Sequence, residues 1–326
     1  MCSLAYTVPV ADPVRIRRAR ELTRGTMSPS NQPRPTKAER TAAAREKARQ
    51  IREAQLKREK RNKLLLRWGV VVALVAVVAI VAIVISVTMR QNTPIADSGP
   101  SPANMNTNGG ITLAKGTAVT AQPASNVNVA SVPTPSTQPT QGQAATAPGV
   151  EAAPKGQPAK VVVYVDFICP ICNQFEQTYG QKLTDLRNAG QITLEYRPIA
   201  FLDRNSTTNY SSRAAAAAAC VANSNPDKYA DFFNKLYAQQ PAEGSAGLTD
   251  QQLKDIASGV GADISKCVDD KTYRPWVKYT TQLASSVGVT GTPTAFVDGK
   301  QWGIGDSANQ AFDAFLQADL DARAKA

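Results

Sequence analysis

The chain of 326 residues contains no histidine and only five cysteines. Two of the cysteines, Cys169 and Cys172, form a C-x-x-C pair, and the sequence has no second pair of this spacing. A structural zinc site needs four Cys or His ligands, so this composition argues against zinc. We expect no metal ion, and the pair needs another explanation.

Charge is absent from a long internal segment. Residues 68–89 read WGVVVALVAVVAIVAIVISVTM, 22 residues without an ionisable side chain. As a helix rising about 1.5 Å per residue, the segment reaches about 33 Å, enough to cross the hydrocarbon core of a bilayer. It begins too far from the N-terminus, and lacks the small-residue cleavage site, for a cleaved signal peptide. We expect one transmembrane helix that stays in the protein.

Excess positive charge is confined to one side of this segment. Residues 1–67 contain 18 Lys/Arg against 6 Asp/Glu, and 13 of these bases lie between Arg34 and Arg67. On the other flank, Arg90 is followed by no base until Lys115. The positive-inside rule predicts a single-pass cell-membrane protein with residues 1–67 as a basic cytoplasmic tail and an extracytoplasmic C-terminal domain. The tail favours anionic lipid headgroups over nucleic acid as its partner.

Two further segments have no features of a folded core. Met27 opens MSPSNQPRPT, which suggests an alternative start, and we interpret residues 1–26 as an extension of the coding sequence. Residues 91–158 are rich in Pro, Thr, Ser, Gln, Ala and Gly and contain no Phe, Trp or Tyr. Such a composition cannot assemble a core of its own, so we expect residues 90–158 to be a disordered linker.

The remainder, residues 159–326, has the pattern of an α/β domain. The stretch KVVVYVDF at residues 160–167 is apolar on both faces, which is typical of a central strand. A helical pattern and a strand over residues 191–201 follow, and this β-α-β order predicts a parallel strand pair. A helical insertion is expected over about residues 207–287. A strand over residues 294–299 and a closing helix capped near Asp306 or Ser307 complete the pattern.

The position of the C-x-x-C pair indicates its chemistry. Cys169 follows the buried strand and opens a helix, where unpaired N–H groups and the positive end of the helix dipole favour a thiolate. Pro170 suits the first helical turn. Cys172, one turn into the helix, can attack a mixed disulfide on Cys169 and release it. The alternative of a purely structural staple is weak, because so small a loop restrains the unfolded chain little.

These features resemble a known family. The element DFICPIC after a first strand, a helical block in mid-domain, and GVTGTPT before a strand and a VDGK turn are similar to the DsbA-like thiol–disulfide oxidoreductases of the thioredoxin-fold superfamily. With its membrane anchor, the chain resembles actinobacterial members of this family. The resemblance implies a thioredoxin-like fold with an inserted helical subdomain, preceded by a disordered linker and one transmembrane helix.

The resemblance also implies roles for particular residues. Cys169 is expected to be the exposed, attacked cysteine and Cys172 the buried resolving one, while Pro170 and Ile171 support the site between them. Pro293 is expected to be a cis-proline facing the pair, and Thr292 to offer its backbone to substrate. No cofactor is implied beyond the redox-active disulfide of the pair itself.

Three departures leave the direction of electron flow open. Ile171 occupies the position that is often His, so the thiolate lacks an imidazolium and we expect weaker oxidising power. Val163 stands where related proteins often keep a buried acid, and nearby Asp166 is as consistent with a turn or capping residue as with a proton shuttle, so we leave it out of the catalytic set. Thr292 replaces the more familiar Val and also occurs in reductases and isomerases.

Cys220 and Cys267 bracket the helical insertion. On an oxidising side of the membrane, and outside any C-x-x-C pair, they favour a structural disulfide, which actinobacterial DsbA-like proteins often carry as well. A second redox relay is the alternative.

We therefore interpret the chain as an extracytoplasmic, membrane-tethered enzyme that forms disulfide bonds in secreted or cell-envelope proteins. Its partners would be secreted polypeptides with cysteine thiols and a quinone-linked membrane oxidase of the VKOR or DsbB kind, and we expect a monomer. A disulfide reductase or isomerase of the same fold is the first alternative. A thioredoxin-like module that binds proteins without turnover is the second.

Overall fold

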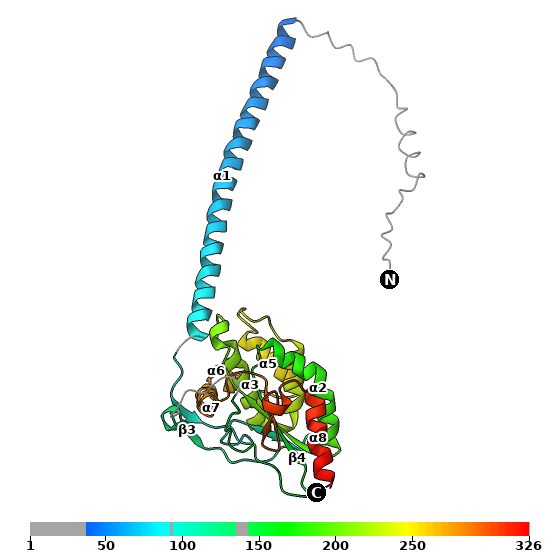
Figure 1. Ribbon diagram of the computed structural model, residues 1–326. Coiled ribbons are helices and arrows are strands. Elements are labelled where there is room, and N and C mark those ends of the chain that lie inside the picture. Colours follow the sequence, from blue (N-terminus) through cyan, green and yellow to red (C-terminus); the bar gives the residue numbers. More distant parts are fainter. Residues whose placement is uncertain (1–36, 92–93, 135–142, 326) are drawn as a thin grey trace, which may run out of the picture. The chain divides into compact units, whose positions relative to one another are not determined.

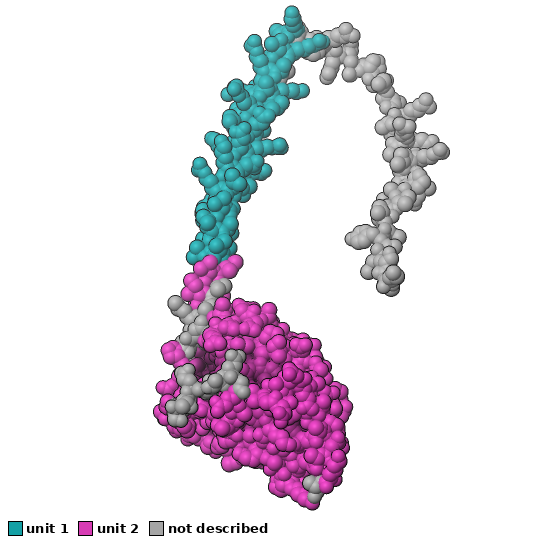
Figure 2. Space-filling model, in the orientation of Figure 1, with its two compact units in different colours: residues 1–79 teal, residues 80–326 magenta. Residues whose placement is uncertain are grey.

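The computed structural model of the protein describes residues 37–91, 94–134 and 143–325. Clustering of contacts divides the chain into two units, Met1–Ala79 and Ile80–Ala326, coloured separately in Figure 2. The interpretation of residues 1–26 as an extension concerns a segment outside the described residues.

The N-terminal helix α1 runs without interruption over Lys37–Gln91 (Figure 1). Its basic part is helical and carries an i, i+4 ion pair between Arg49 and Glu53 at 3.5 Å. An 18-residue window of the helix has a mean hydropathy of 2.7, and none of this window is buried. By length and composition the helix can therefore cross a membrane.

The C-terminal unit is built on a five-stranded sheet with the order β2-β5-β4-β6-β7. The central strand β4 pairs in parallel with β5, and all other pairs are antiparallel. The fold is therefore of the predicted thioredoxin-like kind. The strands are β2 (Ile111–Leu113), β4 (Ala159–Val165), β5 (Ile192–Pro198), β6 (Thr294–Val297) and β7 (Lys300–Gln301).

Helices connect and cover these strands. The crossover between β4 and β5 is α2, and the predicted helical insertion is present between β5 and β6. Thr249 caps α5 with a capping box completed by Gln252, as its sequence suggests. The helices are α2 (Pro170–Asn188), α3 (Tyr210–Ser224), α4 (Tyr229–Ala238), α5 (Asp250–Gly259), α6 (Ser265–Asp269), α7 (Arg274–Ser286) and α8 (Phe312–Lys325), with short 3₁₀ turns at η3 (Asp203–Asn205), η4 (Pro226–Lys228) and η5 (Gly305–Ser307).

Both faces of β4 are buried, as its apolar sequence predicts. Val163 points into the larger core cluster, whereas Val162 and Tyr164 belong to a second cluster on the opposite face. On the first face, Phe175 of α2 meets Phe312 of α8 with ring centroids 5.0 Å apart, and the two helices lie side by side in Figure 1. Enclosure on both sides fixes the end of β4, where the C-x-x-C pair begins.

The prediction of a disordered linker over residues 90–158 is wrong for most of that range. Ile111 and Leu113 of β2 are buried in the larger core, and Met105 joins them. A second, two-stranded sheet pairs β1 (Ser98–Pro100) with β3 (Asn126–Asn128). Residues 135–142 lie outside the described residues. The folded domain thus begins near residue 94 instead of residue 159.

The physical reason is that this segment completes a core that other residues build. It has too few large apolar side chains to fold alone, but β2 places two of them against an existing sheet. Its backbone also pairs with the edge of β5, in the register Ile111↔Tyr196, and so covers N–H and C=O groups that an edge strand would expose. Composition alone reveals only the shortage of large apolar side chains in this segment.

The closing helix begins later than expected. We predicted a cap near Asp306 or Ser307, but those residues form the 3₁₀ turn η5, and α8 starts at Phe312. The Ser307 hydroxyl donates to the Ile304 carbonyl at 2.9 Å and so closes this turn instead of capping a long helix.

Candidate active site

The C-x-x-C pair lies where β4 gives way to α2. Cys169 precedes the first residue of α2 with extended backbone angles, φ −70° and ψ 116°, and Pro170 opens the helix. The Cys169 carbonyl accepts the first helical hydrogen bond from the Asn173 N–H at 3.3 Å. Cys172 therefore lies in the first turn, and its side chain comes back toward Cys169.

Both cysteines are buried residues, and only Cys169 keeps any exposed surface. Cys169 is 5 % exposed and Cys172 is fully buried, whereas Ile171 between them is 58 % exposed. The expectation of an exposed Cys169 is thus corrected, because the loop before β6 packs over its sulfur. Cys169 is still the only one of the pair that solvent reaches. Both cysteines are free thiols in the structure.

The two thiols have opposite acidities. The pKa of Cys169 falls from 9.0 to about 6, first because the Cys172 thiol donates to its sulfur, and further through the Thr292 side chain and the N–H groups of Cys172 and Ile171. Burial opposes this effect but does not cancel it. Burial raises the pKa of Cys172 well above its usual range, and the negative charge on Cys169 raises it further. Near neutral pH the pair holds one thiolate, on Cys169.

The predicted Thr292-Pro293 motif lies beside the C-x-x-C pair. The Thr292-Pro293 peptide bond is cis, directly before β6. The Thr292 carbonyl lies 3.3 Å from the Cys169 sulfur, although 123 residues separate the two in the chain. The fold therefore brings together Cys169, Cys172, Thr292 and Pro293, as the sequence predicted.

The helical insertion also contributes to this site, through residues that the sequence analysis did not identify. The Gln240 side chain, just after α4, donates to the Cys169 carbonyl at 2.9 Å and to the Phe167 carbonyl at 3.1 Å. The Tyr237 hydroxyl donates to the Asp166 carbonyl at 3.3 Å. In the sequence these two residues belong only to an amphipathic helix pattern, so no local signal marks them.

The Asp166 side chain forms hydrogen bonds within the turn that precedes Cys169. Its carboxylate is fully buried and accepts the N–H groups of Ile168, at 3.1 Å, and Leu202, at 2.9 Å. Burial raises its pKa to about 7, and the nearby charge of Asp203 adds to the rise. The hydrogen bonds match the turn and capping interpretation of this residue.

A half-buried acid, Glu176, lies one turn beyond Cys172. The Glu176 carboxyl accepts the Tyr196 hydroxyl at 2.9 Å, and burial raises its pKa to about 7. Its other oxygen has no hydrogen-bond partner among the described residues. The sequence analysis missed this residue, since an i, i+4 spacing from a cysteine is no signal by itself. No group of three or more His, Cys, Asp or Glu side chains in the described part of the chain is arranged to hold a metal ion.

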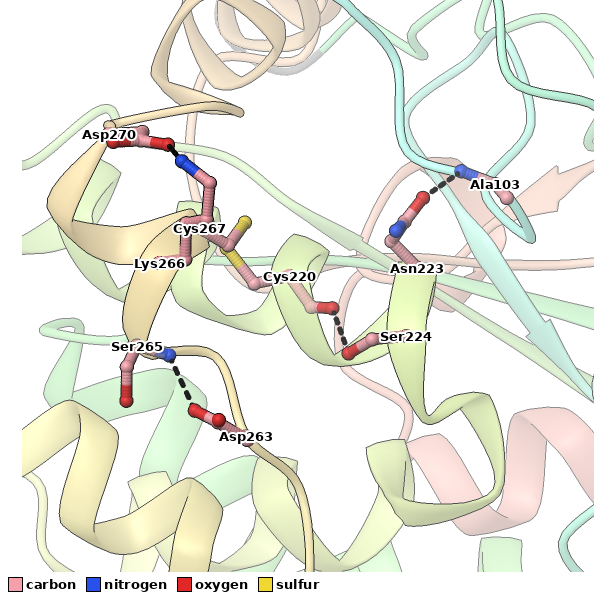
Figure 3. The surroundings of a disulfide bond; sticks show 9 residues. All are labelled: Ala103, Cys220, Asn223, Ser224, Asp263, Ser265, Lys266, Cys267 and Asp270. Carbon is pink, nitrogen blue, oxygen red and sulfur yellow. Dashed lines mark hydrogen bonds and ion pairs between the residues drawn. A yellow bond between two sulfur atoms is a disulfide. The ribbon is translucent and has the colours of Figure 1, made fainter.

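Cys220 and Cys267 lie outside this site and are bonded to each other. The bond joins α3 to the short helix α6 across 47 residues, with 6.0 Å between the Cα atoms (Figure 3). Cys220 is 2 % exposed. Around the bond, the Ser224 hydroxyl donates to the Cys220 carbonyl at 2.9 Å, and the Ser265 N–H donates to Asp263 at 2.9 Å.

Comparisons with known proteins agree with this geometry. The family model described as thioredoxin matches residues 147–318. The chain belongs to the thioredoxin family.

Individual relatives match part of the chain. The serine/threonine-protein kinase PknE of Mycobacterium tuberculosis is 35 % identical over 120 residues, which cover 35 % of this chain and 21 % of the kinase. Disulfide bond formation protein D of Bacillus subtilis is 26 % identical over 148 residues, 44 % of this chain and 64 % of that protein. The chain therefore spans about a fifth of the length of the first relative. The solved reduced form of DsbG from Mycobacterium tuberculosis is 29 % identical, with a TM-score of 0.46, over 54 % of this chain and 86 % of that one.

Proposed function

We propose that the protein is a membrane-tethered, extracytoplasmic thiol–disulfide oxidoreductase that forms disulfide bonds in secreted or cell-envelope polypeptides. The observation that carries this proposal is the contrast between the two thiols. Cys169 is acidic and partly accessible beside the cis Thr292-Pro293 bond, and Cys172 is buried and weakly acidic. Thiol–disulfide exchange needs this combination of a good leaving thiolate and a protected resolving thiol.

The reaction starts from the Cys169–Cys172 disulfide. A substrate thiolate attacks the Cys169 sulfur, the Cys169–Cys172 bond breaks, and Cys172 leaves as a thiolate that takes up a proton. A second substrate thiolate then attacks the substrate sulfur of the mixed disulfide, and Cys169 leaves as a thiolate. Two electrons pass from the two substrate thiols to the pair, and the substrate gains one disulfide.

The low pKa of Cys169 favours reduction of the Cys169–Cys172 disulfide. A thiol with a pKa of about 6 is a better leaving group than an ordinary cysteine, and stabilising the reduced form makes the disulfide more oxidising. Ile171 supplies no positive charge, so hydrogen bonds and the start of α2 stabilise the thiolate instead. We expect an oxidant weaker than family members with His in this position.

Renewal of the disulfide requires an electron acceptor. We assign this role to a quinone-linked membrane oxidase of the VKOR or DsbB kind, which would take the two electrons of the reduced pair. The redox-active disulfide is the only cofactor that the reaction on Cys169 and Cys172 requires.

Membrane attachment is supported by α1. Large apolar side chains along it are exposed, for example Leu74 at 61 % and Ile80 at 60 %, and a surface of this kind is stable only when lipid or protein covers it. The bases between Arg34 and Arg67 favour a cytoplasmic N-terminus. To test the topology, the exposed residue Thr117 is replaced by cysteine, and intact cells are labelled with a membrane-impermeant maleimide. Labelling only after lysis would contradict it.

Thr292 also fits a second function, that of a reductase or isomerase. Because its side chain helps to stabilise the Cys169 thiolate, the residue that departs from the oxidase pattern lies in the site itself. A reductase or isomerase would use the same contacts with the pair held reduced by a membrane donor.

The resting redox state of the pair in cells separates these functions. Cells are quenched in acid, free thiols are alkylated, and the full chain is analysed by mass spectrometry. An oxidase is expected to be mostly oxidised at Cys169 and Cys172, and a reductase mostly reduced. Purified full chain in detergent is then given a dithiol peptide, with Cys169→Ser as control. If the wild-type chain oxidises the peptide no faster than this variant, the proposal fails.

A further inference from the structure

A cavity of about 620 Å³ lies beside the loop that follows β5. Asn209 and Ser212 line it from the start of α3, and Arg274 and Lys278 line it from the first turns of α7. Thr281 lies one turn further along α7. None of the residues of the cysteine site lines this cavity, so it is separate from the site already described.

Arg274 is the unusual residue of this cavity. It is 5 % exposed, and its Nε atom has no hydrogen-bond partner among the described residues. Burial lowers the pKa of its guanidinium, and the charge of Asp203 opposes this effect only in part. Asp203 also lines the cavity, but its carboxylate is already bound to the Ser212 N–H at 2.8 Å and to the Ser212 hydroxyl.

A neighbouring arginine shows how this protein normally satisfies such a group. Arg213 is also buried, but it pairs with Asp250 at 2.8 Å and donates to the Thr208 carbonyl at 2.9 Å. A buried guanidinium nitrogen without such a partner has an uncompensated desolvation cost. The cost is offset if an anion enters the cavity beside Arg274.

Other groups in the cavity suit an anion. The α7 helix begins at its wall with Arg274, and the N-terminal end of a helix is positive. The N-terminal end of α3 is already occupied by the Asp203 carboxylate. Lys278 adds a second cation, shared with Asp97 at 2.5 Å. Thr281 accepts the Ala200 N–H at 3.0 Å, which leaves its hydroxyl proton to donate.

We infer that this cavity binds a phosphate group, with the Arg274 guanidinium as its main ligand and Lys278 and Thr281 as supporting ones. A guanidinium presents several donors in one plane and matches phosphate oxygens well. A cavity of about 620 Å³ also admits a group larger than a lone carboxylate.

The chain itself indicates the source of the phosphate. Pro94 and Ile95 line the cavity, and Pro94 is three residues after Gln91, where α1 ends. Three residues reach at most about 11 Å. If α1 spans the membrane as proposed, Pro94 at the cavity wall is within this reach of the end of the membrane helix, and a lipid phosphate is the favoured ligand. This choice of source rests on the proposed anchoring, whereas the phosphate chemistry does not.

Thermal unfolding of the full chain tests the inference. The protein in a neutral detergent is titrated with inorganic phosphate at constant ionic strength, with chloride as the balancing ion. Phosphate is expected to raise the melting temperature of the wild-type chain in a saturable way. In Arg274→Gln the apparent affinity is expected to fall about tenfold or more, as for loss of one charge-assisted hydrogen bond.

Two variants control for loss of charge and for misfolding. Arg204→Gln removes an exposed arginine of η3 that does not line the cavity, and it is expected to respond like the wild type. Arg274→Lys keeps the charge and is expected to retain part of the response. An equal phosphate response in the wild type and Arg274→Gln, or no response in the wild type, would overturn the inference.

The source is tested in nanodiscs of phosphatidylcholine mixed with phosphatidylglycerol. If a lipid phosphate fills the site, added inorganic phosphate no longer stabilises the wild-type chain, while Arg274→Gln melts lower relative to wild type than it does in detergent. If inorganic phosphate still stabilises the wild type, the site binds free phosphate and the lipid assignment is wrong. Oxidation of a dithiol peptide, measured in parallel, is independent of either result.

Discussion

The acidity of Cys169 depends first on one neighbour. The Cys172 thiol makes the largest contribution to lowering its pKa, ahead of Thr292 and the backbone N–H groups. The resolving cysteine therefore does more than close the disulfide, because it also donates a hydrogen bond to the nucleophile. This dual use accounts for an acidic thiol in a site without a histidine.

Replacing Cys172 by Ala tests this dependence. We expect the apparent pKa of Cys169 to rise by about 1 to 2, because one hydrogen bond to a charged sulfur is lost. The rate of alkylation by iodoacetamide, followed against pH, reports the thiolate. In the wild-type reduced chain it should rise through about pH 6 and then level off. In Cys172→Ala the midpoint should lie higher.

Cys172→Ser is the matched control, since its hydroxyl still donates. It should keep most of the acidity of Cys169 while abolishing disulfide closure. Coincident profiles for Cys172→Ala and the wild type would show that other groups stabilise the thiolate.

At the scale of elements, the helical insertion holds the segment that carries Cys169. The contact runs through the side chain of Gln240, which binds the carbonyls of Phe167 and Cys169. An insertion can therefore influence chemistry at a strand-to-helix junction that lies far from it in the sequence.

Gln240→Met should lower the free energy of unfolding by about 1 to 3 kcal/mol, because the Phe167 carbonyl loses its side-chain donor and the Cys169 carbonyl keeps only the Asn173 N–H. Urea denaturation of the reduced protein measures this change. Gln239→Met, an exposed neighbour, is the control and should change stability little. If both variants have equal stability, the Gln240 contacts carry no net energy.

The segment before the central strand is a second case at this scale. Ile111 is fully buried in β2, so Ile111→Ala should cost about 2 to 5 kcal/mol of unfolding free energy. Exposed Thr117→Ala, in the same segment, should cost little. Chemical denaturation compares the two. A disordered linker, in contrast, would tolerate both substitutions equally.

At the scale of the whole molecule, the bond between Cys220 and Cys267 limits how far the chain can open. Closing a loop of 47 residues removes conformational entropy from the unfolded state worth about 4 kcal/mol. We expect the Cys220→Ser, Cys267→Ser double variant to lose stability of this order while keeping the activity of the C-x-x-C pair.

Mild reductant provides the check that separates a structural bond from a redox relay. The Cys169–Cys172 bond should open first, while Cys220–Cys267 resists. Mass spectrometry after alkylation reports both bonds in one sample, and the double serine variant identifies the products. Equal lability of the two bonds would favour a relay.

The sequence predicted much of this molecule because several signals are local. Apolar residues on both faces of residues 160–165 identify a central strand, and the β-α-β order determines its parallel partner. The C-x-x-C pair and the Thr-Pro step are also readable in a few residues. Each depends on short-range chemistry, namely alternation of side chains, a missing proline N–H, or a helix start.

The redox pair, the fold type and the apolar segment that can cross a membrane are readable in the sequence alone. Three other facts come from the folded structure: Ile111 belongs to the core, Gln240 supports Cys169, and the Arg274 Nε atom is buried without a hydrogen-bond partner. These three facts depend on which distant segments pack together. Burial and hydrogen bonding are properties of the assembled fold, and no pattern within one segment records them.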